Sequence, residues 1–185
     1  MQTGANLTES QRRMADLWDE HTQSGFQALS VEGTLGTMTE DPYVNHVPVM
    51  TGGAGLDEVR GFYAQCFIPK QAPDTELTFV SRTVGENQLV DELIFKFTHT
   101  VEMDWMLPGI PPTGKRVEFP VVVVVGFRDE MIASERIYWD QASVLVQVGL
   151  IDPESLPVTG IEASRRVLDP TLRSNESIER NGSRG

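Results

Sequence analysis

The sequence has little cysteine, few basic residues and no long apolar run. Its single cysteine, Cys66, excludes an internal disulfide. The 15 lysines and arginines face 27 aspartates and glutamates, and the resulting net charge of −12 disfavours binding to phosphate backbones and anionic lipid. The longest apolar run, at residues 121–127, is far below the roughly 20 residues that span a bilayer. We therefore expect neither a nucleic-acid nor a membrane partner.

Signals for export, metals and cofactors are also missing. The segment MQTGANLTESQRR has no apolar core of the kind that a signal peptide needs, so we expect a cytoplasmic protein. The three histidines, His21, His46 and His99, are widely spaced and form no metal-ligand pattern. The glycine-rich stretch GGAGLDEVRG contains acidic residues that would repel a bound anion. It is therefore predicted to be a turn before a helix. We expect no metal, nucleotide or flavin cofactor.

The first third of the chain has the periodicity of helices. LTESQRRMADLWDEHTQSGFQAL opens with a capping-box pattern, Thr8 and Gln11, and continues with apolar residues at three-to-four-residue spacing. This pattern predicts a long amphipathic helix with His21 near its buried stripe. Shorter helices are expected around residues 31–38 and 56–68. Length and a hydrophobic content of 39% fit one domain.

After residue 74 the apolar period changes to two. ELTFVSRTVG, LVDELIFKFTHTVEMDW, KRVEFPVVVVVGF and EMIASERIYWD read as four strands separated by turn signals. Helices followed by an antiparallel meander predict the α+β class, with the helices on one face of a curved sheet. We expect residues 1–151 to form this domain. Residues 152–185 are expected to be a partly disordered extension in which LPVTGIEASRRVL packs back on the domain or a partner subunit.

Three stretches resemble a known family. MTEDPYVNHVPVMTGGAG, FTHTVEMDWMLPGIPPTGKRVEFP and ERIYWDQASVLVQVGL are similar to the SnoaL-like polyketide cyclase branch of the nuclear-transport-factor-2-like superfamily. The resemblance runs from about residue 10 to about residue 170. It implies a cystatin-like cone, in which a strongly bent antiparallel sheet is closed by N-terminal helices around a deep apolar pocket. It also implies a homodimer that pairs through the sheet.

Asp140 is the first candidate for chemistry. Strand alternation places it on one face with Arg136 and Tyr138, so its side chain is expected to project inward where the strand ends. A carboxylate in an apolar pocket gains proton affinity and suits a general base. The resemblance also implies an essential aspartate at this position. The alternative is that Asp140 caps the helix QASVLVQVGL, which would lower its proton affinity; the two roles are compatible.

The other candidates are polar residues near the expected pocket and aromatic wall residues. His99 shares the inward face of its strand with Phe95 and Phe97, so it is either a substrate contact or a core histidine with a partner. Asn45 and His46 lie where the resemblance places a loop at the pocket mouth. Either residue would bind a substrate carbonyl and its developing enolate, or would anchor the loop. Four aromatic residues complete the expected substrate-binding set: Tyr138, Trp105, Tyr63 and Phe79.

These features together predict a cofactor-independent acid/base enzyme. It would remove a proton next to a carbonyl in an apolar polyketide-like or terpenoid-like substrate, with Asp140 as the base. His99 with Asn45 or His46 would stabilise the enolate, and an aldol-type cyclisation would follow. Two alternatives stay open. One is a dehydratase, double-bond isomerase or epoxide hydrolase that uses the same pocket, and the other is a non-catalytic small-molecule-binding protein.

Overall fold

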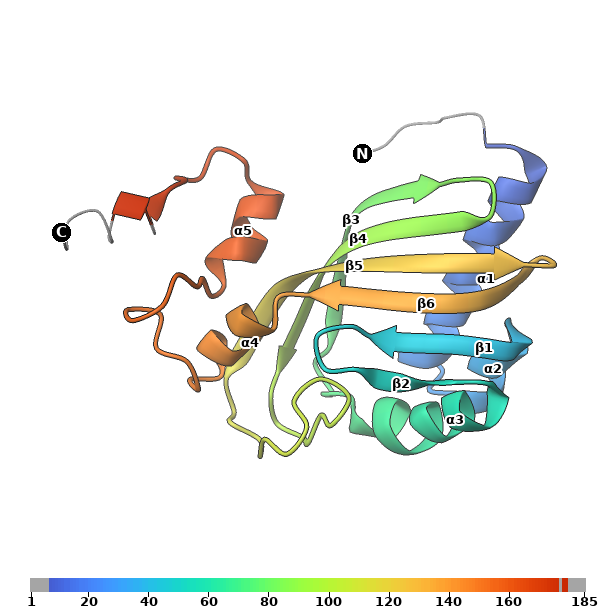
Figure 1. The fold of residues 1–185 in the computed structure, drawn as a ribbon, viewed down its shortest axis with the longest axis horizontal. Coiled ribbons are helices and arrows are strands. Elements are labelled where there is room, and N and C mark those ends of the chain that lie inside the picture. The colour runs from blue at the N-terminus through green and yellow to red at the C-terminus, as the bar shows by residue number, and fades with distance from the viewer. Residues whose placement is uncertain (1–6, 177, 180–185) are drawn as a thin grey trace.

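The computed structural model describes residues 7–176 and 178–179 (Figure 1). Residues 1–6, 177 and 180–185, among them part of the extension that was expected to be partly disordered, lie outside these ranges. Three of the described α-helices precede β3 (Glu76–Val84) in the chain and two follow β6 (Met131–Trp139). They are α1 (Glu9–Phe26), α2 (Val31–Gly36), α3 (Leu56–Gly61), α4 (Gln141–Gln147) and α5 (Glu162–Leu168). A π-helical turn, Phe62–Phe67, continues α3. Within the described residues, none of the helices has the length and apolar character needed to cross a membrane.

One curved sheet of six strands forms the centre of the fold. Its order is β2-β1-β6-β5-β4-β3. The strands are β1 (Met38–His46), β2 (Thr51–Ala54), β3 (Glu76–Val84), β4 (Gln88–Thr98), β5 (Arg116–Arg128) and β6 (Met131–Trp139). All neighbouring strands are antiparallel except β1 and β6, which are parallel. The predicted α+β class with a curved sheet is confirmed, and the four predicted strands are β3 to β6.

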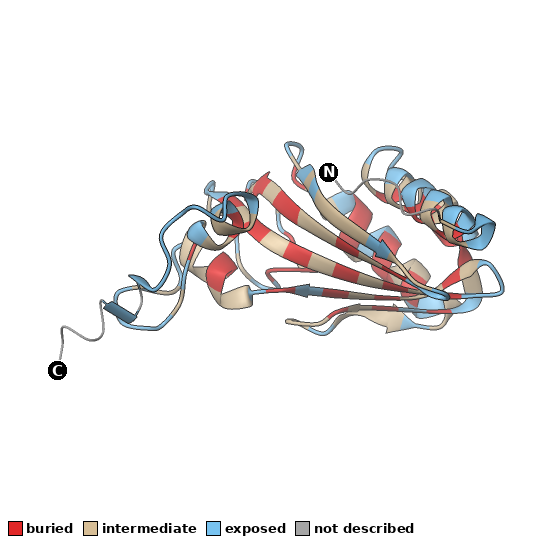
Figure 2. Ribbon diagram, turned by 90° about the horizontal axis from the view of Figure 1, so that it is seen from above, coloured by how far each residue is buried: buried red, intermediate tan, exposed pale blue. Residues whose placement is uncertain are grey.

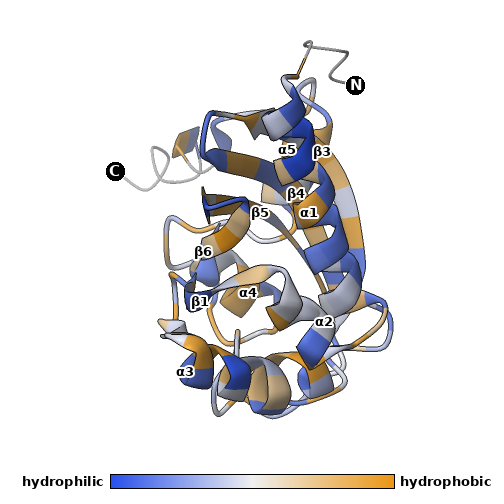
Figure 3. Cartoon of the chain, turned by 90° about the vertical axis from the view of Figure 1, so that its right-hand side faces the viewer, coloured by the Kyte–Doolittle hydropathy of each residue, from blue (hydrophilic) through white to orange (hydrophobic). Residues whose placement is uncertain are grey.

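Alternating residues of the long strands give the sheet an inner and an outer face. Buried and partly exposed positions alternate along β5, a pattern visible as colour bands in Figure 2. The N-terminal helices cover the inner face. The predicted capping box of Thr8 and Gln11 starts α1, and this helix buries Met14, Trp18 and His21. Its outward side carries hydrophilic residues (Figure 3). The sheet and helices thus enclose a space between them.

The C-terminal extension contacts the sheet through helix α5, which lies against β5. The Ser143 hydroxyl in α4 donates a hydrogen bond to the Gly160 carbonyl just before α5, at 2.8 Å. The Gln147 side chain binds both backbone groups of Glu118 in β5 at 2.9 Å, which fixes α4 to the same strand. We propose that residues 152–168, which lead to and include α5, are an integral cover of the domain.

A truncation after Ile151 tests this role. Removing the extension uncovers Ser143 and part of β5, so we expect the melting temperature to fall by at least about 3 °C. Circular dichroism during heating measures the change. An unchanged melting temperature together with an unchanged oligomeric state would show that the extension does not stabilise the domain.

Candidate active site

A cavity of about 160 Å³ lies between the inner face of the sheet and the helices. Aromatic and aliphatic side chains form most of its wall, among them Phe95 of β4, Val121 and Val123 of β5 and Trp139 of β6. Trp105, in the loop between β4 and β5, closes one side. Polar side chains reach the cavity in two groups, the Glu135 cluster (His21, Tyr63 and Glu135) and the Asp91 cluster (Trp18, Arg82 and Asp91). Both contain charged groups that are almost completely buried.

The Glu135 cluster joins α1, β6 and the π-helical turn. Glu135 is only 5% exposed, and its Oε1 atom lies 3.1 Å from Nε2 of His21. The Tyr63 hydroxyl donates a hydrogen bond to the same Oε1 atom at 2.9 Å. Among the described residues, none donates to the second carboxylate oxygen, Oε2. The cluster therefore holds one oxygen of Glu135 firmly and leaves the other available to a ligand in the cavity.

Hydrogen bonding indicates the proton positions on His21. The Thr37 hydroxyl donates its proton to the Thr34 carbonyl at 2.7 Å, so it accepts a hydrogen bond from Nδ1 of His21, also at 2.7 Å. On the other side of the ring, Nε2 faces the carboxylate of Glu135. A ring that donates from both nitrogens is an imidazolium, which forms an ion pair with the carboxylate. His21 is thus placed as the counter-charge of Glu135.

Opposing effects act on the pKa of Glu135. Burial alone would raise the pKa, because it disfavours the charged form. The charge of His21 and the hydrogen bonds from His21 and Tyr63 outweigh burial and lower the pKa below its ordinary value of 4.5. Burial and the charge of Glu135 raise the pKa of Tyr63 well above 10. At neutral pH the cluster therefore contains a carboxylate and a protonated phenol.

His46 lies beside this cluster, near the end of β1. It is 6% exposed and surrounded by the rings of Phe62, Phe67, Trp105 and Trp139, whose centroids lie 5.2 to 5.9 Å from its own. Its Nδ1 atom is buried without a hydrogen-bond partner in the described part of the chain. Burial lowers the pKa of His46 to about 4, against a raising effect from the charge of Glu135. His46 is therefore neutral at pH 7 and has an N–H group to offer.

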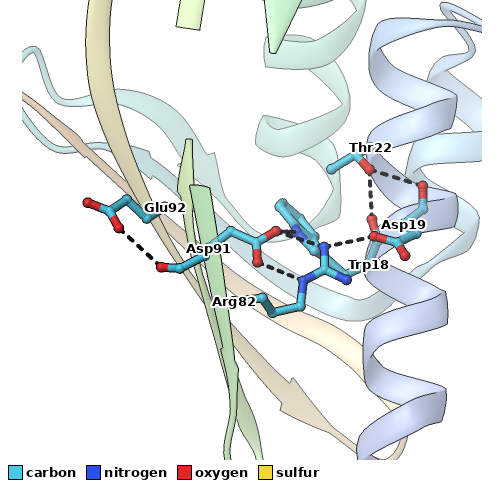
Figure 4. Close-up of polar contacts among 7 residues, drawn as sticks. Trp18, Asp19, Thr22, Arg82, Asp91 and Glu92 are labelled. Atoms are coloured by element: carbon cyan, nitrogen blue, oxygen red, sulfur yellow. Dashed lines mark hydrogen bonds and ion pairs between the residues drawn. The ribbon is translucent and has the colours of Figure 1, made fainter. Parts of the chain in front are cut away.

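The Asp91 cluster lies on the wall formed by α1, β3 and β4 (Figure 4). Asp91 accepts two hydrogen bonds from Arg82, at 2.7 and 2.8 Å, and one from the indole N–H of Trp18 at 2.8 Å. Arg82 also binds Asp19 on α1 at 2.8 Å. Burial would lower the pKa of Arg82, but the bonds to Asp91 and Asp19 raise it, so Arg82 stays cationic. The Trp18 ring stacks on His21 at 5.2 Å, which connects the two clusters.

Comparison with known proteins identifies the family. The profile of the SnoaL-like polyketide cyclase family matches residues 8–148, most of the chain. The chain belongs to this family. The resemblance found in the sequence is thereby confirmed, and a general polyketide cyclase-type function follows from the membership. No curated protein matches the sequence.

Several solved structures share the fold of this chain. A SnoaL-like polyketide cyclase candidate from Jannaschia sp. CCS1 has a TM-score of 0.63 and 18% identity, over 80% of this chain and 100% of that chain. TsrD from Streptomyces laurentii has a TM-score of 0.59 and 15% identity, over 79% of this chain and 100% of that chain. A protein with a ketosteroid isomerase-like fold from Catenulispora acidiphila has a TM-score of 0.55 and 15% identity, over 74% and 94%. At these identities the likeness concerns the fold alone.

Four of the residues predicted from the sequence line the cavity of this SnoaL-like domain. They are His46, Tyr63, Trp105 and Phe79. Phe79 is 55% exposed and marks the mouth of the cavity, together with Leu77 on the same strand. His46 belongs to strand β1, not to the loop that the sequence predicted. Asn45 directly precedes His46 in β1 but does not line the cavity, because successive side chains of a strand point to opposite faces.

The expected inward position of Asp140 and Tyr138 is corrected by the structure. Asp140 is exposed, and its Oδ1 atom accepts hydrogen bonds from the backbone N–H groups of Ala142 (2.9 Å) and Ser143 (3.3 Å). This is the helix-capping alternative. Tyr138 is 42% exposed, and Trp139 has the inward position instead. The alternation was correct, but the inward face of β6 belongs to the odd-numbered residues.

His99 is buried but does not line the cavity. It follows the last residue of β4, and its Nδ1 atom contacts the Thr113 hydroxyl at 3.2 Å. Its Nε2 atom has no partner in the described residues. Burial lowers the pKa of His99, so the ring is neutral. This placement fits the core-histidine alternative.

Glu135 and Asp91 are the site residues that sequence reasoning missed. Asp91 has the same strand parity as Phe95, which the sequence placed inward and which lines the cavity. Glu135 has the same parity as Ile137 and Trp139, both of which line the cavity. A charged residue in register with an apolar strand face was the available signal in both cases.

The low pKa of His46 predicts a loss of stability in acid. The unfolded chain has a histidine pKa near 6.5, so as pH falls below 6.5 the unfolded state takes up a proton before the folded state does. His46 therefore stabilises the fold fully above pH 6.5, and this contribution is lost between pH 6.5 and 4. The loss is on the order of 3 kcal/mol. Urea unfolding at pH 7 and pH 4.5 should show a smaller difference for His46→Phe than for the wild type; equal differences would contradict the prediction.

Proposed function

We propose that this SnoaL-like protein is a cofactor-independent acid/base enzyme that acts next to a carbonyl of an apolar, polyketide-type substrate. The reaction class that we propose is an aldol-type cyclisation. The proposal assigns proton abstraction to Glu135 and carbonyl polarisation to His46. Asp140, the base expected from the sequence, is left to its role as helix cap because its carboxylate lies outside the cavity.

The proposed chemistry uses two residues that line the cavity, Glu135 and His46. Oε2 of Glu135 removes a proton from the carbon next to the substrate carbonyl. The neutral imidazole of His46 donates its N–H to the carbonyl oxygen, which becomes the enolate oxygen. The enolate carbon then attacks a second carbonyl of the same molecule and forms the ring bond. The proton on Glu135 finally moves to the new alkoxide, which restores the carboxylate.

The observation that carries the proposal is the unpartnered Nδ1 atom of the buried His46 ring, beside the buried carboxylate of Glu135. A buried polar group without a hydrogen bond costs about 1–3 kcal/mol, so a ligand that binds it recovers this energy. A neutral imidazole also polarises a carbonyl without giving up its proton. His21 and Tyr63 keep the carboxylate charged and oriented while it waits for substrate.

Two further parts of the proposal concern assembly and location. We propose a homodimer that pairs through the outer face of the sheet, and a cytoplasmic protein. The outer face of β5 supports the first part, because Val122 and Val124 point away from the cavity and stay partly exposed in one chain. Sedimentation velocity measures the oligomeric state.

Deuterium exchange tests the reaction. Ethyl benzoylacetate in heavy water has an exchangeable carbon next to a ketone, and mass spectrometry measures its exchange with and without enzyme. We expect enzyme-dependent exchange that is lost in Glu135→Gln and kept in Asp140→Asn. Exchange without ring closure on longer substrates would favour the isomerase or dehydratase alternative. Binding of the probe with no exchange would favour a non-catalytic binding protein.

A further inference from the structure

The cavity offers little space for a ligand. Its volume of about 160 Å³ is close to that of cavities that hold benzene, roughly 150 Å³. Sites for drug-sized ligands have volumes of roughly 300–1,000 Å³. A fused system of three or four rings therefore exceeds the space beside Glu135 and His46, whereas one six-membered ring with short substituents fits.

The walls of the cavity are not free to move apart. Phe95 contacts Trp105 and Phe119, with ring centroids 5.9 and 5.6 Å away, and Phe119 contacts Trp139 at 6.3 Å. Trp139 and Trp105 in turn enclose His46. Each ring supports the next, and all five are less than 10% exposed. A larger ligand would have to displace several core side chains at once.

The polar groups also limit the position of the ligand. Oε2 of Glu135 and the ring of His46 lie on the β1 and β6 side of the cavity, and this is where the proposed chemistry requires the carbonyl. On the opposite wall, Asp91 already accepts three hydrogen bonds from Arg82 and Trp18. We expect the apolar part of the substrate to lie in the space between the two walls.

We infer that the substrate is an uncharged, enolisable carbonyl compound with a single ring, or an open chain of similar size, and not a fused polycycle. This inference rests on the proposed function for the position of the carbonyl. The size limit itself depends only on the cavity and its walls.

Two probes with the same head group test the size limit. Ethyl benzoylacetate carries one ring. Ethyl (9-anthroyl)acetate carries three, and its carbonyl is on the middle ring, so both outer rings must fit beside His46 and Glu135. We expect isothermal titration calorimetry to give a Kd at least tenfold weaker for the anthroyl ester. Equal affinities for the two esters would overturn the inference.

The valines of β5 offer a matched pair of double variants. Val121 and Val123 line the cavity, whereas Val117 and Val125 have the same parity on the same strand, are fully buried and do not line it. We expect Val121→Ala with Val123→Ala to improve the affinity for the anthroyl ester at least tenfold. Val117→Ala with Val125→Ala removes the same four methyl groups elsewhere and should bring no gain. The inference would also be overturned if the variant Val121→Ala with Val123→Ala, with its fold verified by circular dichroism, bound the anthroyl ester no more tightly than the wild type does.

The two proposals fail in different ways. Tight binding of the benzoyl ester without enzyme-dependent exchange would overturn the proposed function and leave the size limit in place. Exchange of both esters with equal affinity would support the function and overturn the size limit.

Discussion

Glu135→Gln is expected to slow enzyme-dependent exchange by about 10²- to 10⁴-fold, the range that general base catalysis contributes. Glutamine has nearly the same shape as glutamate, but its amide does not accept the proton. His21 and Tyr63 keep a hydrogen-bond acceptor at the position of Oε1, so the cavity should retain its form. The affinity for ethyl benzoylacetate should therefore change much less than the exchange rate. Rates from mass spectrometry and Kd values from calorimetry separate the two effects.

The pH profile of the wild type provides an independent check on the same residue. Despite burial, the charge of His21 and the hydrogen bonds from His21 and Tyr63 hold the pKa of Glu135 below its ordinary value. The carboxylate is therefore charged at neutral pH, and the exchange rate should show no loss of base there. The rate should fall only in more acidic solution, where Glu135 gains a proton. Asp140→Asn, which keeps the helix cap, should leave both the rate and the profile unchanged. A variant Glu135→Gln with wild-type exchange would remove Glu135 from the mechanism.

The fold was predictable because its patterns are local. The capping box at Thr8 and Gln11 fixes the start of α1, and the apolar period of two marks β3 to β6. Strand β1 was missed because its sequence, MTEDPYVNH, is polar for a buried strand. Its parallel pairing with β6 joins segments about 90 residues apart in the chain, and such pairing leaves no local pattern.

The candidate site was only partly predictable because strand alternation does not say which set of residues faces inward. In β6 one set of alternating residues contains Glu135, Ile137 and Trp139. The other set contains Arg136 and Tyr138. Which of the two sets faces the cavity decides the identity of the proposed base. The more apolar set is the inward one. The ion pair of Glu135 with His21 also depends on how α1 crosses the sheet, which no local pattern determines.

Arg82→Leu is expected to destabilise the fold by about 3–5 kcal/mol, because it removes one partner of a buried ion pair. Arg82 and Asp91 are directly opposite each other on β3 and β4, and the side chain of Asp91 is 3% exposed. Without Arg82 this carboxylate retains only the indole N–H of Trp18 as a donor. Urea unfolding followed by circular dichroism gives the free energy of unfolding.

A surface pair provides the control for this prediction. Arg13 binds Glu130, but both side chains are more than half exposed, so Arg13→Leu should lower the free energy of unfolding far less than Arg82→Leu does. The double variant Arg82→Leu with Asp91→Leu removes both charges and should recover most of the lost stability. Equal losses for Arg82→Leu and Arg13→Leu would contradict the view of Asp91 as a buried charge.

A double variant with recovered stability would also show whether the Asp91 cluster positions the site. In that variant Trp18 loses the acceptor that holds its ring against His21. Slower exchange in a stable double variant is the expected result.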